Sequence, residues 1–162
     1  MFIRGKPIKF GYKVWMLCSL DGYPYQAVIY AGKTDRPENI TLGEHVVLEF
    51  AKLLPTATSH KLFFDNFFSS YTLMMQLREM SIRATGTARE GRFADAPFTN
   101  KKQFKRKPRG YYEYKGNGSI NIVRWNDNNV VTMITNFDHT FLVKHVQRHI
   151  KGTTGKTQAC QP

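Results

Sequence analysis

An apolar stretch that runs directly into a helical pattern gives the clearest structural signal in the chain. Residues 60–64 end in three apolar positions without polar alternation, which predicts a strand covered on both faces. The following residues predict a helix capped by Ser69 or Ser70. Its buried stripe has helical spacing: Leu73, Met74, Leu77 and Met80. This strand and helix form half of a βα unit, and Asp65 falls at the carboxyl end of the strand.

Two earlier stretches alternate between apolar and polar positions and predict a β-hairpin. Residues 8–18 and 25–31 supply its strands. Between them, Asp21 and Gly22 favour a two-residue turn of type I′, because that turn needs positive φ at both central positions. We therefore expect the residues that flank this pair to close the hairpin.

A capping box and a further strand complete the first half of the chain. Thr41 and Glu44 can satisfy each other's backbone amides at the start of a helix, which Pro55 ends. Residues 82–87 then predict another strand. The order strand, strand, helix, strand, helix, strand predicts an α/β fold with a mixed sheet flanked by helices.

From residue 91 the pattern changes to short β segments and turns. Residues 111–114, 120–125 and 130–135 predict three strands, which are joined by turns rich in Asn and Gly. Residues 152–162 predict a loop that stops without capping an element, as we expect of an incomplete chain.

The charge balance indicates a polyanionic partner. The 162 residues contain 24 Lys and Arg against 12 Asp and Glu, a net charge of +12. Residues 1–90 carry 11 basic and 8 acidic side chains, a net charge of +3, whereas residues 91–162 carry 13 and 4, a net charge of +9. We therefore expect the partner surface mainly in the second half.

The basic segment, residues 101–109, has six cations in nine positions and no acid: Lys101, Lys102, Lys105, Arg106, Lys107 and Arg109. Such a run favours contact with nucleic-acid phosphates or a nuclear-import signal, and both can hold at once. The simpler alternative is a solvated loop that contacts nothing. We expect nucleic-acid contact here and a nuclear location for the protein.

Other classes of protein fit this composition poorly. The two cysteines, Cys18 and Cys160, provide neither a disulfide framework nor a zinc site, so a reducing compartment fits them. No apolar stretch approaches the roughly 18 to 20 residues of a membrane-spanning helix, and the N-terminus lacks a signal-peptide core. We expect no membrane partner.

Asp65 is the first candidate for a functional residue. It stands among four phenylalanines, where a carboxylate is costly unless it binds a cation, a metal ion or backbone donors. Open α/β sheets place ligand-binding and reactive groups at the carboxyl ends of their strands. The alternative is that Asp65 only caps the following helix, although Ser69 and Ser70 are better placed for that role.

Several spaced motifs resemble those of the PiggyBac-type transposases and of the proteins domesticated from them. In order, they are residues 4–15 (Arg-Gly-Lys-Pro-Ile-Lys-Phe-Gly-Tyr-Lys-Val-Trp), 22–23 (Gly-Tyr), 30–33 (Tyr-Ala-Gly-Lys), 42–43 (Leu-Gly), 64–70 (Phe-Asp-Asn-Phe-Phe-Ser-Ser), 84–89 (Ala-Thr-Gly-Thr-Ala-Arg) and 134–136 (Ile-Thr-Asn). The resemblance covers most of the chain up to about residue 140, and the motifs occur in the order of the family.

This resemblance implies an RNase H-like catalytic core that is interrupted by a β-rich insertion and incomplete at the C-terminus. Residues 1–90 would be the first part of the core, residues 91–133 the basic insertion, and residues 134–162 the return toward the core. It also implies a DDD enzyme, in which three aspartates hold two Mg²⁺ or Mn²⁺ ions that activate water or a 3′-hydroxyl for attack on DNA. DNA would be the partner, and the family pattern implies a homodimer.

The acidic residues of the family are matched only in part. Asp65 matches the second aspartate. Ser19 stands at the position of the first, and the nearest acid, Asp21, is a second candidate for catalysis and metal binding that a tight turn also favours. The stretch Asn-x-x-Met-Gly-Gly-Val-Asp, which carries the third, is absent.

Three functions follow as alternatives. The first is a fragment of a PiggyBac-like DNA transposase that is inactive as these 162 residues. The second is a domesticated DNA-binding protein that keeps the fold without the chemistry. The third, an RNA-binding or chromatin-interaction module, needs only the charge and the aromatic residues. We expect the first.

Overall fold

The computed structural model describes residues 5, 7–8, 10–32, 35–55, 59–93 and 96–139, together with the backbone of two further strands at 144–149 and 156–161. The chain forms two compact units, Met1–Leu54 and Pro55–Pro162. No helix in the described ranges combines the length and the apolar content that a membrane span requires.

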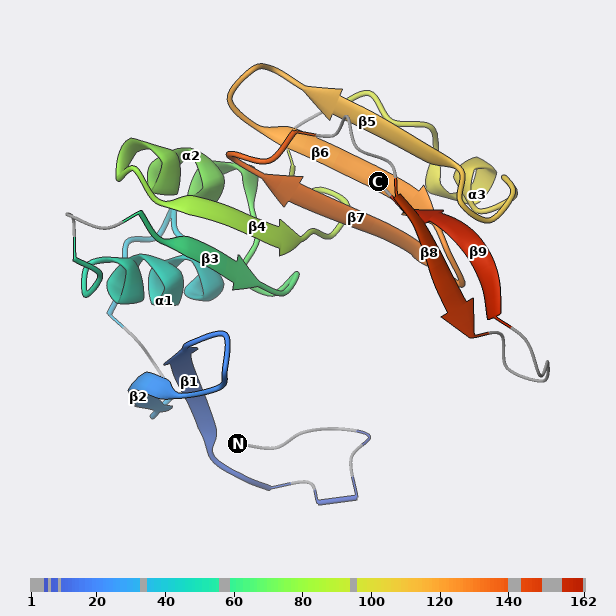
Figure 1. Cartoon of the computed structure of the whole chain (residues 1–162). Helices are drawn as coiled ribbons and strands as arrows, with labels where there is room; N and C mark the ends of the chain where they lie inside the picture. Colours follow the sequence, from blue (N-terminus) through green and yellow to red (C-terminus); the bar gives the residue numbers. More distant parts are fainter. Residues whose placement is uncertain are drawn as a thin grey trace. The chain divides into compact units, whose positions relative to one another are not determined.

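The first unit holds an antiparallel hairpin and one helix (Figure 1). In the hairpin, β1 (Lys13–Cys18) pairs with β2 (Pro24–Tyr30), and α1 (Leu42–Ala51) follows. The predicted capping box is confirmed, because the Thr41 side chain accepts from the Glu44 amide while the Glu44 carboxylate accepts from the Thr41 amide at 2.7 Å. These bonds satisfy amides that the start of a helix leaves unpaired.

The predicted two-residue turn of the hairpin is wrong by one residue. The Ser19 amide donates to the Tyr23 carbonyl at 2.8 Å, so the loop contains Leu20, Asp21 and Gly22. The Gly22 amide donates to the Ser19 carbonyl at 3.1 Å, and Gly22 has a φ of 87°, which glycine adopts without strain. An Asp-Gly pair suits this three-residue loop as well as the shorter one, so the sequence located the turn but not its length.

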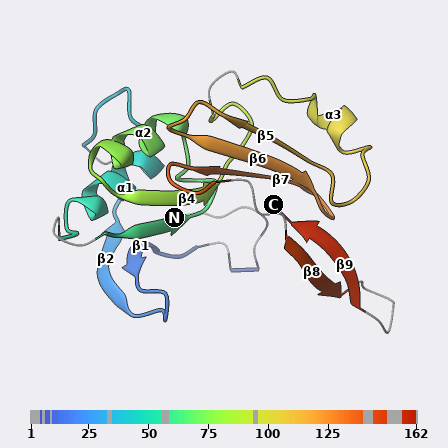
Figure 2. The ribbon, with the colours of Figure 1, turned by 45° about the horizontal axis from the view of Figure 1, so that its top comes forward.

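The second unit is built on a mixed sheet in the order β3-β4-β7-β6-β5 (Figures 1 and 2). Its strands are β3 (Lys61–Phe64), β4 (Arg83–Thr87), β5 (Tyr112–Gly116), β6 (Asn121–Asn126) and β7 (Val130–Thr135). β3 and β4 are parallel, and the other neighbours are antiparallel. α2 (Tyr71–Glu79) connects β3 to β4, which confirms the predicted βα unit.

The structure confirms a mixed α/β fold, but the strands are divided between sheets differently from the prediction. β1 and β2 form a two-stranded sheet, so the predicted mixed sheet is confirmed only for the second unit. There, β7 pairs with β4 and is followed by β6 and β5, so strands from the predicted insertion continue the sheet of β3 and β4. The insertion boundaries at residues 91 and 133 stay a prediction.

Two predictions about single segments are wrong. β3 lies at the edge of its sheet and Phe63 is 66% exposed, so this strand is not covered on both faces. A short apolar run does not by itself distinguish an edge strand from a central one. β9 (Lys156–Gln161) occupies the predicted C-terminal loop and pairs antiparallel with β8 (Lys144–His149). The two strands form a hairpin of consecutive segments that are rich in polar residues, so no apolar alternation indicated them.

α2 packs on the sheet through the predicted apolar stripe (Figure 2). Leu73, Met74 and Leu77 are fully buried, whereas Met80 at the end of the helix is 40% exposed. Ser70 is the N-cap, since its hydroxyl accepts from the Leu73 amide at 3.1 Å. The helix is therefore held at its start by a cap and along its length by burial.

Asn136 joins α2, β4 and the end of β7 through a fully buried set of hydrogen bonds. Its Oδ1 accepts from the Ala84 amide at 2.7 Å, and its Nδ2 donates to the Ile82 and Met74 carbonyls at 2.9 and 3.2 Å. The residue is 4% exposed. Each polar atom of the side chain thus satisfies a buried backbone group.

Replacing Asn136 with alanine is expected to lower the free energy of unfolding by about 3 kcal/mol, because buried backbone groups lose their partners at roughly 1 to 3 kcal/mol each. Urea unfolding followed by circular dichroism measures this loss. Asn128→Ala, in an exposed turn, is the matched control and should change stability little. Equal losses in the two variants would contradict the role given to Asn136.

Candidate functional site

Asp65 lies directly after β3, in the turn that leads into α2. The residue is exposed, and its Oδ1 accepts from the Phe67 amide at 2.8 Å. Its backbone carbonyl accepts from the Phe68 and Ser69 amides at 3.2 and 3.3 Å. Asp65 therefore shapes this turn, but it is not the cap of α2, which is Ser70. An ionised carboxylate has a second oxygen, so an exposed aspartate in this role can still bind a cation.

β4 approaches the Asp65 turn at Gly86. A Cβ at this position would lie 2.4 Å from the Ser69 hydroxyl oxygen and 2.8 Å from both the carbonyl oxygen and a ring carbon of Phe64. These distances are too short for any side chain, so glycine permits the close approach of the two backbones. The position of the acid-bearing turn on the sheet thus depends on Gly86.

Asp21 is exposed in the hairpin loop of the first unit, in the turn role that its sequence context favours. Within the residues that the structure describes, no group of three or more His, Cys, Asp or Glu side chains could hold a metal ion. These residues therefore do not fit a two-ion centre by themselves, because several carboxylates must converge to hold two ions. The assignment of Asp65 and Asp21 as metal ligands stays a prediction.

A polar cavity of about 380 Å³ in the second unit lies at the carboxyl ends of β3 and β4. It is lined by Asn66, Ala88, Arg89, Glu90, Lys101, Arg124, Val130 and Thr132. Three cations against one acid make the lining favourable for an anion. Arg89 Nε donates to Asn66 Oδ1 at 2.7 Å, which connects the end of β4 to the residue next to Asp65.

The basic segment is an anchored turn of helix rather than a loop without contacts. It begins with α3 (Lys101–Phe104), and Phe104 is fully buried with its ring centroid 5.5 Å from that of Tyr111. Asn126 Nδ2 donates to the Lys107 carbonyl at 2.6 Å and holds the end of the segment. The buried Phe104 side chain and a hydrogen bond to the backbone hold the segment in place, so its cationic side chains are not needed for this and lie on the surface.

The six predicted nucleic-acid contacts differ in what holds them. Arg109 forms an ion pair with Asp127, with Nη2 2.6 Å and Nε 2.8 Å from Oδ1. Lys107 Nζ lies 5.3 Å from the centroid of the Tyr111 ring. All six are exposed, and the other four are Lys101, Lys102, Lys105 and Arg106. Arg109 is therefore the least available of the six for a phosphate.

Arg124 is a residue that sequence reasoning missed. It is 2% exposed, with Nη1 donating to the Thr99 carbonyl at 2.9 Å and Nη2 3.1 Å from Glu90 Oε1. Its guanidinium carbon lies 4.7 Å from the Phe98 ring centroid and within 6 Å of two further phenylalanine rings, a cation–π arrangement. A cation between the apolar residues Val123 and Trp125 of a predicted strand was the available signal.

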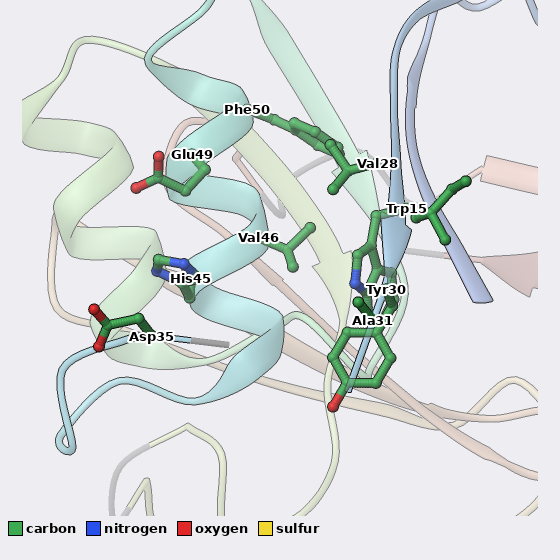
Figure 3. Close-up of a pocket in the computed structure, with 10 residues that line it drawn as sticks. Trp15, Val28, Tyr30, Ala31, Asp35, His45, Val46, Glu49 and Phe50 are labelled. Atoms are coloured by element: carbon green, nitrogen blue, oxygen red, sulfur yellow. The ribbon is translucent and has the colours of Figure 1, made fainter. Parts of the chain in front are cut away.

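A second pocket, also about 380 Å³, lies between the hairpin and α1 in the first unit (Figure 3). Figure 3 shows Val46 and Phe50 on the side of α1 toward Trp15, whereas Glu49 lies away from the aromatic rings. Lys52 donates to Glu49 at 2.6 Å, and this hydrogen bond holds the pKa of the Glu49 carboxyl below its ordinary value. The charged groups do not converge on the apolar lining, so the chemistry favours the polar cavity as the functional site.

Comparison with known proteins identifies the class to which this fold and site belong. The sequence matches the family model described as "Transposase IS4" over residues 1–161. The chain therefore belongs to this transposase family, and the relatives below are of its PiggyBac type. This finding confirms the resemblance that the spaced motifs predicted.

Two human proteins are among the similar curated sequences. The chain is 37% identical over 166 residues to PiggyBac transposable element-derived protein 3, and 34% identical over 168 residues to PiggyBac transposable element-derived protein 2. The alignments cover 99% and 98% of this chain but 28% of each relative. The chain thus spans a little more than a quarter of their length.

A solved structure shares the fold. It is the piggyBac transposase synaptic complex with hairpin DNA, which matches with a TM-score of 0.71 at 24% sequence identity. The match covers 96% of this chain and 32% of that chain. The likeness establishes the architecture, whereas the roles of single residues rest on the geometry above.

Proposed function

We propose that these residues form a DNA-binding part of the RNase H-like core of a PiggyBac-type transposase. The observation that carries the proposal is the basic segment, in which a buried Phe104 anchors cations that stay exposed. The parallel β3–β4 pair with α2 as its crossover supports the architecture. Membership of a transposase family and the synaptic DNA complex of a relative in fold support DNA as the partner.

The proposed reaction of the complete protein is metal-dependent cleavage and transfer of DNA strands. Asp65 is the proposed catalytic acid and metal ligand from this chain, and Asp21 is the second candidate. Mg²⁺ or Mn²⁺ would stabilise the attacking and leaving oxygens of the phosphodiester. Because the described residues do not provide a site for two ions, we expect the 162 residues alone to bind DNA without cleaving it.

A domesticated DNA-binding protein is the second candidate function. Ser19 supports it, because a hydroxyl is a poor substitute for an anionic ligand of Mg²⁺. Both candidates bind DNA, and they differ in Mg²⁺-dependent nicking by the complete gene product. Two further proposals follow from the sequence: the basic segment favours a nuclear location, and the family resemblance favours a homodimer.

A salt titration of DNA binding tests the proposed function. Filter binding of a duplex to the 162-residue chain is expected to show log K falling steeply with log salt, because Lys and Arg release counterions from the phosphates. Five phosphate contacts would give a slope of about −4.5, at roughly −0.9 for each contact. A slope near zero would overturn the proposal of a phosphate-contacting surface.

A further inference from the structure

The polar cavity contains a buried cation whose anionic partner is easily displaced. Arg124 has 3% of its side chain exposed, whereas 47% of the Glu90 side chain is exposed. Removing a guanidinium from water without an anion is costly, so Arg124 needs a negative group at this place. An exposed carboxylate has water as an alternative partner and can leave at a lower cost.

The guanidinium of Arg124 is held independently of Glu90. The Thr99 carbonyl accepts from Nη1 at 2.9 Å, and the rings of Phe93, Phe98 and Phe104 surround its plane. Its buried Nε has no hydrogen-bond partner within the described part of the chain. The guanidinium therefore stays in place when the carboxylate moves away, and Nη2 and Nε are then both left to donate.

We propose that the cavity takes one phosphate of the nucleic-acid backbone and that Glu90 occupies this place until the phosphate arrives. This inference rests on the proposed function and goes beyond it. Arginine binds phosphate through two parallel hydrogen bonds, which a phosphodiester oxygen pair matches in place of the Glu90 carboxylate. Arg89 and Lys101 line the same cavity and supply the remaining positive charge. Glu90 thus weakens DNA binding by competing with it.

Glu90→Gln tests the competition without changing the size of the side chain. We expect this variant to bind a DNA duplex about fivefold to tenfold more tightly than the unchanged chain at 0.15 M salt, within the range of coupling between groups in contact. Glu79→Gln removes the same charge from an exposed position at the end of α2 that does not line the cavity. Equal gains in the two variants would show a simple effect of net charge and overturn the proposal.

A double-mutant cycle assigns the gain to Arg124. Arg124→Lys keeps the charge but loses the planar fork, so we expect weaker binding and little or no gain when Glu90→Gln is added. If Glu90→Gln tightened duplex binding just as much in the Arg124→Lys background, the proposal that Glu90 and phosphate compete for Arg124 would be overturned. Thermal unfolding of every variant verifies the fold, and the Glu90→Gln comparison does not depend on the stability of Arg124 variants.

Inorganic phosphate distinguishes a backbone phosphate from a small free anion. Millimolar phosphate is added to duplex binding by the unchanged chain and by Glu90→Gln. Equal inhibition of the two, together with equal affinity of the two for the duplex, would overturn the proposal. A chain that binds no duplex at any salt would instead overturn the proposed function. Duplex binding that Glu90→Gln leaves unchanged would overturn only the inference about the cavity.

Discussion

Alanine at the five cations of the basic segment other than the ion-paired Arg109 is expected to lower DNA affinity by roughly a hundredfold or more at 0.15 M salt. The variant replaces Lys101, Lys102, Lys105, Arg106 and Lys107. Each phosphate contact adds about 0.9 to the steepness of log K against log salt, so the loss of all five makes the slope shallower by about 4.5. Filter binding of a duplex across a salt series measures both the affinity and the slope.

Arg109→Ala is the control for this result. The Arg109 guanidinium forms an ion pair with Asp127 at 2.6 Å. Its replacement should therefore lower the stability of the fold, and it should change DNA affinity much less than replacing the other five cations does. A fluorescent fusion of the variant that lacks the other five cations tests whether the basic segment directs nuclear entry. Unchanged DNA binding together with unchanged nuclear entry would show that the segment is only a solvated surface.

Alanine at Asp65 is expected to abolish Mg²⁺-dependent nicking and strand transfer by the gene product that carries these residues. We expect a loss of roughly a thousandfold, since charge stabilisation at such a site is worth several kcal/mol and about 1.4 kcal/mol corresponds to tenfold. Nicking of supercoiled plasmid with and without Mg²⁺ measures the effect. DNA affinity should change little, because a carboxylate repels a phosphate and Asp65 is therefore not expected to contact the DNA backbone.

Asp65→Asn separates the charge from the turn. The asparagine side chain keeps an oxygen that can accept from the Phe67 amide, whereas alanine loses that hydrogen bond and about 1 kcal/mol of stability. Both variants should therefore lack nicking, and only the alanine variant should unfold more easily. Full nicking by Asp65→Asn would show that the carboxylate acts only in the turn, and our site assignment would be wrong.

The local elements followed from the sequence because local interactions determine them. The capping box at Thr41 and the Ser70 cap lie within four residues of the groups that they satisfy. The α2 stripe could be predicted for the same reason, since its spacing alone defines a buried face. The position of Asp65 after β3 followed from the change in hydrophobic period.

Features that depend on distant partners could not be predicted in this way. Asn136 bonds to residues 52 to 62 positions away, and Arg124 meets Glu90 across 34 positions. β7 pairs with β4 across about 50 positions of sequence, as in Thr85 opposite Thr135. The spaced motifs indicated the family, but they did not show that Phe104 anchors the basic segment or that a charged cavity lies beside Asn66.

Because Gly86 has only a hydrogen atom as its side chain, position 86 controls where the turn that carries Asp65 can lie, although Gly86 itself stands inside a strand. Any larger group there would meet Ser69 and Phe64 and displace the loop between them, which carries the acid. Variants at this site should consequently mimic loss of the acid in a genetic screen while leaving every surface cation untouched. Such mutants would map to the sheet and not to the proposed DNA-binding surface, so a map of expected DNA contacts alone would not explain them.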